Sequence, residues 1–251
     1  MQVKMKIVVP TYNTEQWIKR CLSSISSQVF TDWECVIIND ASTDATGDVI
    51  NSLDFVSKDP RFKVVHNTKN VKALKNIVDG FNYLKCEDDP ECIMMVVDGD
   101  DFLFSEYSLD IIRQAYVQYP TVLLTYGNWV GYPDGTDSNC RPYSRETVIN
   151  NRFRYDPFVA SHLRTFKSKL WYSIKDEDLR DDKGDYFVAG WDVAFMMPML
   201  EMAHERHIFI PNRLYSYNRY NPISDCKVRE GEQLSAVDIV KSREPYVRKE
   251  F

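Results

Sequence analysis

The densest group of chemically useful side chains in this sequence is the acidic stretch DGDD, which contains Asp98, Asp100 and Asp101. It directly follows the apolar run IMMVV, which is typical of a buried strand. Carboxylates crowded at one strand end repel one another unless a cation or protons offset their charge. Oxygen ligands suit Mg²⁺ or Mn²⁺, which usually take their remaining ligands from water and substrate phosphates. We therefore predict a divalent metal site at this acidic turn. The competing interpretation is a solvated acidic turn that caps the next helix.

Polar residues also follow two earlier apolar runs. The first run ends in PTYN at residues 10–13, and the second ends in NDAS at residues 39–42. In open α/β sheets, ligands bind at the carboxyl ends of the strands. We therefore expect these two segments to lie at the same sheet edge as the DGDD turn.

The elements that must position these residues follow an alternating pattern as far as residue 131. Short apolar runs alternate with amphipathic segments, which favours βαβ units and a mainly parallel sheet. Helical spacing of apolar residues predicts helices over residues 71–84 and 109–119, and a third that begins near Asp192. The predicted strands are residues 5–10, 34–39, 62–66, 93–98 and 122–129.

Composition sets limits on the class of protein. The chain has 251 residues, of which 44% are hydrophobic and 13% aromatic, so it can bury a sizeable core. The net charge is −6 and the basic residues are dispersed, which argues against a nucleic-acid partner. The N-terminal apolar run is too short for a signal peptide or a transmembrane segment.

The cysteines show no CxxC pair and no dense framework, which favours free thiols in a reducing compartment. We therefore expect a soluble, cytoplasmic protein. The six cysteines are Cys21, Cys35, Cys86, Cys92, Cys140 and Cys226.

Four segments resemble glycosyltransferase family 2 in their order and spacing. They read IVVPTYNTEQWIKRCLSSISSQ, WECVIINDASTD, HNTKNVKALKN and VVDGDDFL. The resemblance implies a GT-A fold, in which a Rossmann-like, mainly parallel central sheet is flanked by helices. It also implies inverting transfer of a sugar from a nucleotide-sugar donor to an acceptor hydroxyl, with a divalent cation, Mn²⁺ or Mg²⁺. Residues 1–251 would then form one domain, with a nucleotide-sugar-binding half (1–131) and an acceptor-binding half (132–251).

The same resemblance assigns residues to the nucleotide base. Pro10, Thr11 and Tyr12 form the loop against the base, where the Tyr12 ring packs on it. Asp40 accepts a hydrogen bond from a base N–H. This hydrogen bond suits uracil or thymine, whose N3 carries a donor, and a UDP-sugar is favoured, although guanine also has N–H donors.

The resemblance also assigns the binding of the diphosphate and the metal to the acidic turn and to a nearby cation. Asp98, Gly99 and Asp100 contact the donor, with Asp98 on the ribose or the metal and Asp100 on the metal. Lys75 stands where the family often has an arginine, and it neutralises phosphate without the bidentate fork of a guanidinium. The closing segment carries Asn218 and Tyr220 where the family often has arginine and histidine, so no histidine ligand is expected there and Arg219 becomes the replacement cation.

The acceptor side is implied by two further segments. Asp192 matches the family's catalytic carboxylate, with Trp191 in place of the preceding acid. Such a base takes the proton of the acceptor hydroxyl. Aspartate at a helix start also caps the helix, and the two roles are compatible. In SHLRTF, His162 and Arg164 are expected at the acceptor or the diphosphate, although a structural role for His162 competes.

Three other functions are weighed against this one. A nucleotidyltransferase would carry a glycine-rich basic loop after the first strand, and PTYN has no glycine. A non-catalytic nucleotide-sugar-binding module is disfavoured by the presence of both DGDD and Asp192. A glycoside hydrolase also uses two carboxylates, but it needs no nucleotide site.

Overall fold

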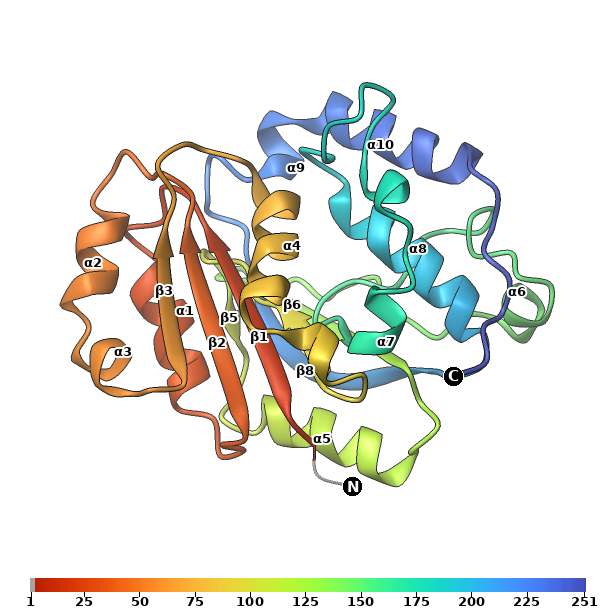
Figure 1. Cartoon of the computed structure of the whole chain (residues 1–251), viewed down its shortest axis with the longest axis horizontal. Helices are drawn as coiled ribbons and strands as arrows, with labels where there is room; N and C mark the ends of the chain where they lie inside the picture. The colour runs from red at the N-terminus through yellow and green to blue at the C-terminus, as the bar shows by residue number, and fades with distance from the viewer. Residues whose placement is uncertain (1–2) are drawn as a thin grey trace.

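The computed structural model describes residues 3–251, apart from the side chains of residues 225 and 226 (Figure 1). In chain order the elements are β1 (Met5–Thr11), α1 (Ile18–Ser26), β2 (Trp33–Asn39), α2 (Thr46–Ser52), α3 (Asp54–Lys58), β3 (Phe62–His66), α4 (Ala73–Tyr83), η1 (Cys86–Asp88), β4 (Ile93–Val96), β5 (Phe102–Leu103), α5 (Ser108–Gln118), β6 (Leu124–Tyr132), α6 (Arg145–Ile149), β7 (Thr165–Lys167), α7 (Ser168–Trp171), η2 (Asp176–Leu179), α8 (Trp191–Ala203), β8 (His207–Asn218), α9 (Asp225–Val228) and α10 (Glu230–Ser242).

One eight-stranded sheet includes strands from both halves of the chain, in the order β3-β2-β1-β4-β7-β6-β8-β5. The α/β fold is confirmed, and the neighbours among β3, β2, β1 and β4 are parallel as predicted. Beyond β4 the sheet is mixed, because β7 runs antiparallel to both β4 and β6. Antiparallel neighbours need no helical crossover, and β7 follows the mainly irregular segment 133–164.

All five predicted strands are present, with shifts at their ends. The third matches over Phe62–His66, whereas the fifth begins and ends two to three residues later, at Leu124–Tyr132. The predicted helices correspond to α4, α5 and α8. Strands β5, β7 and β8 were not predicted, and two of them are short edge or bridging strands of two and three residues.

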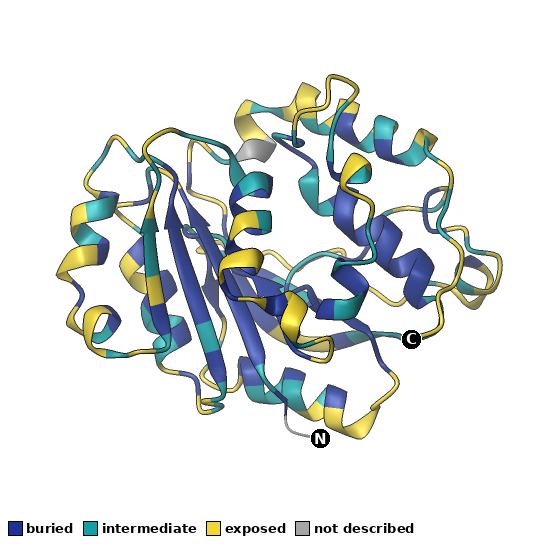
Figure 2. Ribbon diagram, viewed as in Figure 1, coloured by how far each residue is buried: buried dark blue, intermediate teal, exposed yellow. Residues whose placement is uncertain are grey.

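Helices cover both faces of the sheet and give it two hydrophobic cores (Figure 2). Side chains alternate along a strand, so Ile7 and Val9 of β1 pack with α1 and α5 on one face. Val8 packs with α4 and α8 on the other face. Helices on both faces of the sheet therefore pack against β1, and the PTYN segment lies at the carboxyl end of this strand.

Gly80 sets the distance between α4 and the sheet. A Cβ atom at this position would lie 2.6 Å from Val8 Cγ1 and 3.2 Å from Ile38 Cδ1, which is closer than packed carbon atoms approach. Glycine therefore lets α4 lie directly on β1 and β2, and this contact brings the start of α4 to the edge where those strands end.

Two sequence expectations concern properties of the whole chain. The described cysteine side chains, Cys21, Cys35, Cys86, Cys92 and Cys140, are free thiols, and the side chain of Cys226 lies outside the described part. Among the described residues, no helix has both the length and the apolar character needed to span a bilayer.

A buried ion pair fixes α8 to the elements around it. Arg154 Nε donates to Glu201 Oε1 over 2.6 Å and Arg154 Nη2 to Glu201 Oε2 over 2.9 Å. The two side chains are 1% and 0% exposed. Arg154 also donates to the carbonyl of Val240 on α10, and Glu201 accepts the backbone N–H of Tyr246. This network ties α8 to α10 and to the C-terminal segment.

We expect Arg154→Met to lower the free energy of unfolding by about 3–5 kcal/mol, because Glu201 would remain buried without its charged partner. Urea denaturation measures the change. The matched control is Lys58→Met, which breaks an i,i+4 pair with Asp54 whose side chains are 74% and 83% exposed; its cost should stay below about 1 kcal/mol. Equal losses in the two variants would contradict the role assigned to the buried pair.

Candidate active site

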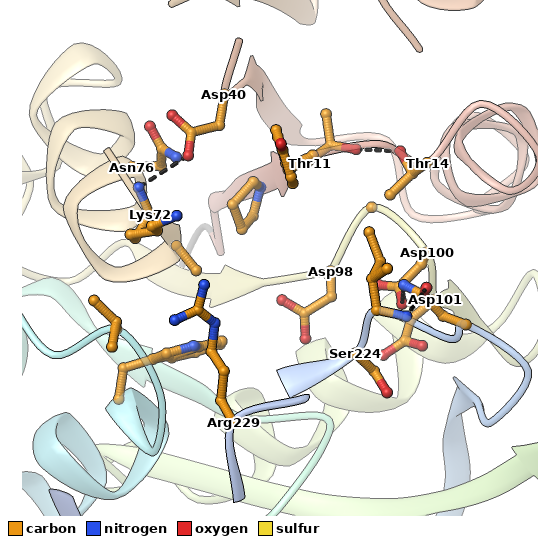
Figure 3. Close-up of a pocket in the computed structure, with 18 of the residues that line it drawn as sticks. Thr11, Thr14, Asp40, Lys72, Asn76, Asp98, Asp100, Asp101, Ser224 and Arg229 are labelled. Carbon is orange, nitrogen blue, oxygen red and sulfur yellow. Dashed lines mark hydrogen bonds between the residues drawn. The ribbon is translucent and has the colours of Figure 1, made fainter. Parts of the chain in front are cut away.

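A cavity of about 490 Å³ lies where the carboxyl ends of β1, β2 and β4 face α8 and the α9–α10 region (Figure 3). This volume is within the range of small-molecule sites. Its walls come from both halves of the chain. The sequence-predicted site residues that line it are Pro10, Thr11, Tyr12, Asp40, Asp98, Gly99, Asp100, His162, Arg164, Trp191 and Asp192.

The structure does not bring the other two predicted residues, Lys75 and Arg219, into this cavity. Lys75 forms an ion pair with Asp79 one turn along α4. Lys75 and Asp79, four residues apart, share a helix face, whereas Lys72, which precedes the helix, and Asn76 line the cavity. Arg219 Nε lies 3.5 Å from Asp134 Oδ2, with both side chains 46% exposed.

Other cations take their places. Lys72 lines the cavity just before α4 begins, and Arg229 lines it just before α10. Figure 3 shows both side chains on the same side of Asp98. Neither cation was assigned to the site from the sequence, and no motif surrounds Arg229. Only the packing of α10 against α8 brings Arg229 to the sheet edge.

The predicted base loop lies at one end of the cavity. Tyr12 is 39% exposed, which leaves its ring free to pack on a ligand. Thr11 Oγ1 is hydrogen-bonded to Thr14 Oγ1 (Figure 3). A Cβ atom at Gly99 would lie 2.5 Å from the Cβ of Thr11, so glycine is required for the DGDD turn to rest against the end of β1.

Asp40 lines the cavity and organises its wall. Its Oδ1 accepts from Asn67 Nδ2 and from the N–H of Val71, and its Oδ2 accepts from the N–H of Lys72, each over 2.9 Å. The carboxylate thus shapes the turn that leads from β3 into α4. Since three N–H groups already bond it, its contact with a base N–H stays a prediction.

Two amide groups on the same wall have an atom without a hydrogen-bond partner. Asn70 Nδ2 donates to the carbonyl of Asp40, which leaves Asn70 Oδ1 unpaired. Asn76 Oδ1 accepts from Asn67 Nδ2, which leaves Asn76 Nδ2 unpaired. Both residues line the cavity. The wall therefore contains one buried acceptor and one buried donor without a hydrogen-bond partner, a feature that was not predicted from the sequence.

The acidic turn forms a cluster suited to a metal ion. Asp98, Asp101 and His162 each offer one ligand atom, and these three atoms lie within 4.8 Å of one another. Asp101 Oδ1 accepts the N–H of Asn218 over 2.6 Å, whereas the buried Asp101 Oδ2 has no hydrogen-bond partner. An orphaned carboxylate oxygen beside a second carboxylate and an imidazole fits a divalent cation.

Asp100, which the sequence assigned to the metal, is outside this three-residue cluster. It lines the cavity beside it, and its Oδ2 accepts from Asn221 Nδ2 over 2.7 Å. Asp98 is common to the predicted pair and to the observed cluster. His162 was assigned to the acceptor or the diphosphate, and the structure places its Nε2 3.4 Å from Asp98 Oδ2.

Burial controls the protonation of these groups. It raises the pKa of Asp98 and, helped by the neighbouring Asp98 charge, raises that of Asp100 to about 6. Burial and the charges of Asp100 and Asp98 likewise raise the pKa of Asp101. Burial and the charge of Arg164 lower the pKa of His162, so its ring is neutral, and its Nε2 lone pair accepts a hydrogen bond from Arg164 Nη2.

The proposed base is linked to this cluster through two side chains. Asp192 lies in the first turn of α8, where no side chain caps the helix. Its Oδ2 instead accepts from Arg164 Nη1 over 2.9 Å. Arg164 Nη2 is hydrogen-bonded to His162 Nε2, and His162 reaches Asp98. The capping interpretation of Asp192 therefore has no support in the geometry.

The chain resembles known proteins in both sequence and structure. Residues 6–174 match the family described as Glycosyl transferase family 2. Glycosyltransferase GlyA of Streptococcus pneumoniae is 24% identical over 225 residues, which are 85% of this chain and 30% of GlyA. Poly(ribitol-phosphate) β-N-acetylglucosaminyltransferase TarS of Staphylococcus aureus is 25% identical over 93% of this chain and 37% of TarS. The chain thus spans about a third of these two relatives.

Two solved structures are similar in fold. S. aureus TarS in complex with UDP-GlcNAc has a TM-score of 0.61 at 17% identity, covering 87% of this chain and 59% of that one. The mannosyltransferase PcManGT of Pyrobaculum calidifontis, in complex with GDP-Man and Mn²⁺, has a TM-score of 0.62 at 16% identity, covering 97% and 66%. At these identities the likeness concerns the fold, and it confirms the GT-A fold expected from the sequence.

The raised pKa values predict how metal binding depends on pH. A carboxyl group whose pKa rises on folding, such as Asp100, stabilises the metal-free protein below about pH 4, and this contribution is lost as the pH rises through about 6. Mn²⁺ should therefore raise the melting temperature more at about pH 7.5 than at about pH 5, where protons compete for the ligands. Differential scanning fluorimetry measures the shift, with excess EDTA as the control. An equal shift at the two pH values would contradict the expectation.

Proposed function

The chain belongs to glycosyltransferase family 2, and from this premise we propose that it transfers a sugar from a nucleoside diphosphate carrier to an acceptor hydroxyl. The observation that carries the proposal is one cavity lined by an acidic turn, several cations and a carboxylate at a helix start. In this arrangement residues 1–131 bind the donor and residues 132–251 contribute most of the acceptor side.

The donor is a UDP-sugar in this proposal. Uracil presents an N–H between two carbonyl groups, and the wall offers Asn70 Oδ1 as an acceptor and Asn76 Nδ2 as a donor. Tyr12 packs on the base. Guanine also presents an N–H beside a carbonyl, so GDP-sugars form the rival class. TarS, solved with UDP-GlcNAc, and PcManGT, solved with GDP-Man, stand for these two classes.

The diphosphate lies between the acidic turn and the cations. Asp98 and the residues beside it would hold a divalent cation, with Asp101 and His162 as the partners that the cluster favours and Asp100 as the partner that the motif favours. Such a cation, when bound, offsets the charge of the leaving diphosphate. Lys72 and Arg229 supply further positive charge, and both lie on the side of Asp98 away from Asp100 and Asp101 (Figure 3).

Asp192 acts as the general base. Its carboxylate takes the proton of the acceptor hydroxyl while the acceptor oxygen forms a bond to the anomeric carbon. The bond from that carbon to the diphosphate oxygen breaks on the opposite face, and the diphosphate leaves with the electron pair. Attack opposite the leaving group inverts the anomeric configuration. Trp191, next to Asp192 on the cavity wall, offers an aromatic face to a carbohydrate acceptor.

The alternatives are not favoured. A nucleotidyltransferase would bind the triphosphate with a glycine-rich loop after the first strand. Residues 10–13, at the end of β1, contain no glycine and carry Thr11 and Tyr12 instead. A binding module without chemistry would have no use for a carboxylate aligned by an arginine across from the acidic turn.

The decisive experiment is a ligand panel read by thermal shift. We expect UDP-sugars with Mn²⁺ to raise the melting temperature more than CMP-, dTDP- or GDP-sugars, and each effect to vanish in EDTA. Calorimetry on the best ligand then gives its affinity with and without metal. If no nucleotide or nucleotide sugar stabilises the protein in either condition, the proposed function is wrong.

Replacing the proposed base separates chemistry from binding. Asp192→Asn keeps the side-chain shape but removes proton acceptance, so turnover should fall by about 100-fold or more. Release of the nucleoside diphosphate, with acceptor or with water as a slow acceptor, measures the rate. Asp79→Asn is the matched control, because Asp79 pairs with Lys75 on the outer face of α4 and should leave turnover unchanged. A parent-like rate in Asp192→Asn would place the base elsewhere.

A further inference from the structure

The backbone of Lys72 adopts a conformation that belongs to glycine. Its φ is 74° and its ψ is 165°, a region that is strained for any residue with a Cβ atom. Glycine at this position would free the chain of that strain, so the lysine lowers the stability of the fold. Strain of this kind persists where the surrounding structure imposes it, and it is concentrated at functional sites. The side chain of Lys72 therefore needs a functional explanation.

Hydrogen bonds on both sides of Lys72 hold this conformation. Its N–H donates to Asp40 Oδ2, and the N–H of Val71 donates to Asp40 Oδ1, each over 2.9 Å. Its carbonyl accepts the N–H of Asn76 over 3.2 Å. Asp40 is 2% exposed, so this anchor is itself fixed in the fold. The conformation is set by the neighbours of Lys72, and another side chain at this position would inherit the strain.

The ammonium group of Lys72 differs from the other cations on the cavity wall. Arg164 Nη1 donates to Asp192 Oδ2 over 2.9 Å, and Arg229 Nη1 donates to Glu232 Oε2 over 2.8 Å. Lys72 lines the same cavity and is half-buried. Among the side chains that the structure describes, no carboxylate forms an ion pair with Lys72 Nζ. Its charge is therefore not committed to another part of the protein.

The position of this charge favours one part of a nucleotide sugar. The base and the ribose of a UDP-sugar are neutral, whereas the diphosphate is anionic, and an ammonium binds phosphate as a compact point charge. The backbone of Lys72 is bonded to Asp40, on the wall to which the base is assigned. Figure 3 shows Lys72 on the side of Asp98 away from Asp100 and Asp101. The phosphate attached to the ribose is therefore the one expected beside Lys72.

Resting on the proposed function, we propose that Lys72 binds the donor phosphate attached to the ribose, and that its strained backbone is retained because it directs the ammonium to this phosphate. The ammonium donates to a non-bridging oxygen of that phosphate. Lys72 is thus a donor-binding residue that recognises the phosphate next to the nucleoside and makes no contribution to recognition of the base.

A series of three ligands tests which group Lys72 binds. Calorimetry with Mn²⁺ measures UMP and UDP, and displacement of UDP measures uridine, on the parent, Lys72→Met and Lys72→Arg. Lys72→Met keeps the length and the backbone strain but removes the charge, so UMP and UDP should both bind about tenfold or more weakly. Uridine affinity should stay unchanged. Lys72→Arg keeps the charge and should recover most of the affinity for UMP and UDP. If GDP binds better than UDP, guanosine, GMP and GDP replace this series.

A glycine substitution tests the strain. Lys72→Gly should raise the melting temperature by about 2 °C or more, while UDP affinity falls about tenfold or more because the ammonium is lost. Lys85→Gly is the matched control. Lys85 has a φ of 51° just after α4 ends and does not line the cavity. Glycine is also favoured there, so this variant should raise the melting temperature and leave UDP affinity unchanged.

Several results would overturn the proposal. Parent-like UDP affinity in Lys72→Met or Lys72→Gly would remove Lys72 from the donor. A loss for UDP without a loss for UMP would assign it to the other phosphate, and an equal loss for uridine would assign it to the nucleoside. A lower melting temperature in Lys72→Gly would refute the strain. Failure of the proposed function looks different, because the parent itself would then bind neither UDP nor another nucleoside diphosphate in the presence of Mn²⁺.

Discussion

Negative charge buried at the end of β4 is the constraint around which the site is arranged. Asp98, Asp100 and Asp101 follow a strand with no exposed residue, and burial raises the pKa of all three groups. Solvent reaches Asp98 and Asp100 only in part and Asp101 hardly at all, so much of the balance must come from protons, from protein N–H groups or from a cation. Asn218 and Asn221, at the far end of the chain, donate to two of these side chains. The same N–H donors therefore hold the closing segment onto the acidic turn.

The rest of the fold keeps the two walls of the cavity at a fixed separation. One sheet joins β1 and β4 to β6 and β8, so the two proposed halves of the site are built on the same continuous sheet. On the outer side of α8, the buried Arg154–Glu201 pair ties the helix to α10 and to the C-terminal segment. The position of Asp192 relative to Asp98 thus depends on an ion pair whose residues never touch the cavity. Disturbing that pair should alter the alignment of the site as well as its stability.

Five of the eight strands and the residues at the ends of β1, β2 and β4 could be predicted from the sequence, because they depend on local patterns. Apolar runs followed by PTYN, NDAS and DGDD required only that parallel strands end at one edge. The cations were harder, because their positions depend on helix phase and on distant packing. Lys75 is turned away from the cavity while Lys72, three residues earlier, faces it, and Arg229 arrives only through the packing of α10 on α8. Asp40 shows a different difficulty. Its presence at a strand end in the site was predicted, but the three N–H groups that donate to its carboxylate can be identified only from the fold.

The departure from a parallel sheet explains the link from Asp98 to Asp192. Strand β7 pairs antiparallel with β4 in the register Met95↔Thr165. Continuing that register by three residues brings Asp98, which follows β4, opposite His162, which precedes β7. His162 and Arg164 both line the cavity, while the intervening Leu163 is buried in the core beneath. An all-parallel sheet would have carried residues 162–164 to the opposite edge. The reversal of this one short strand is therefore what places an imidazole beside the acidic turn and a guanidinium between that turn and the proposed base.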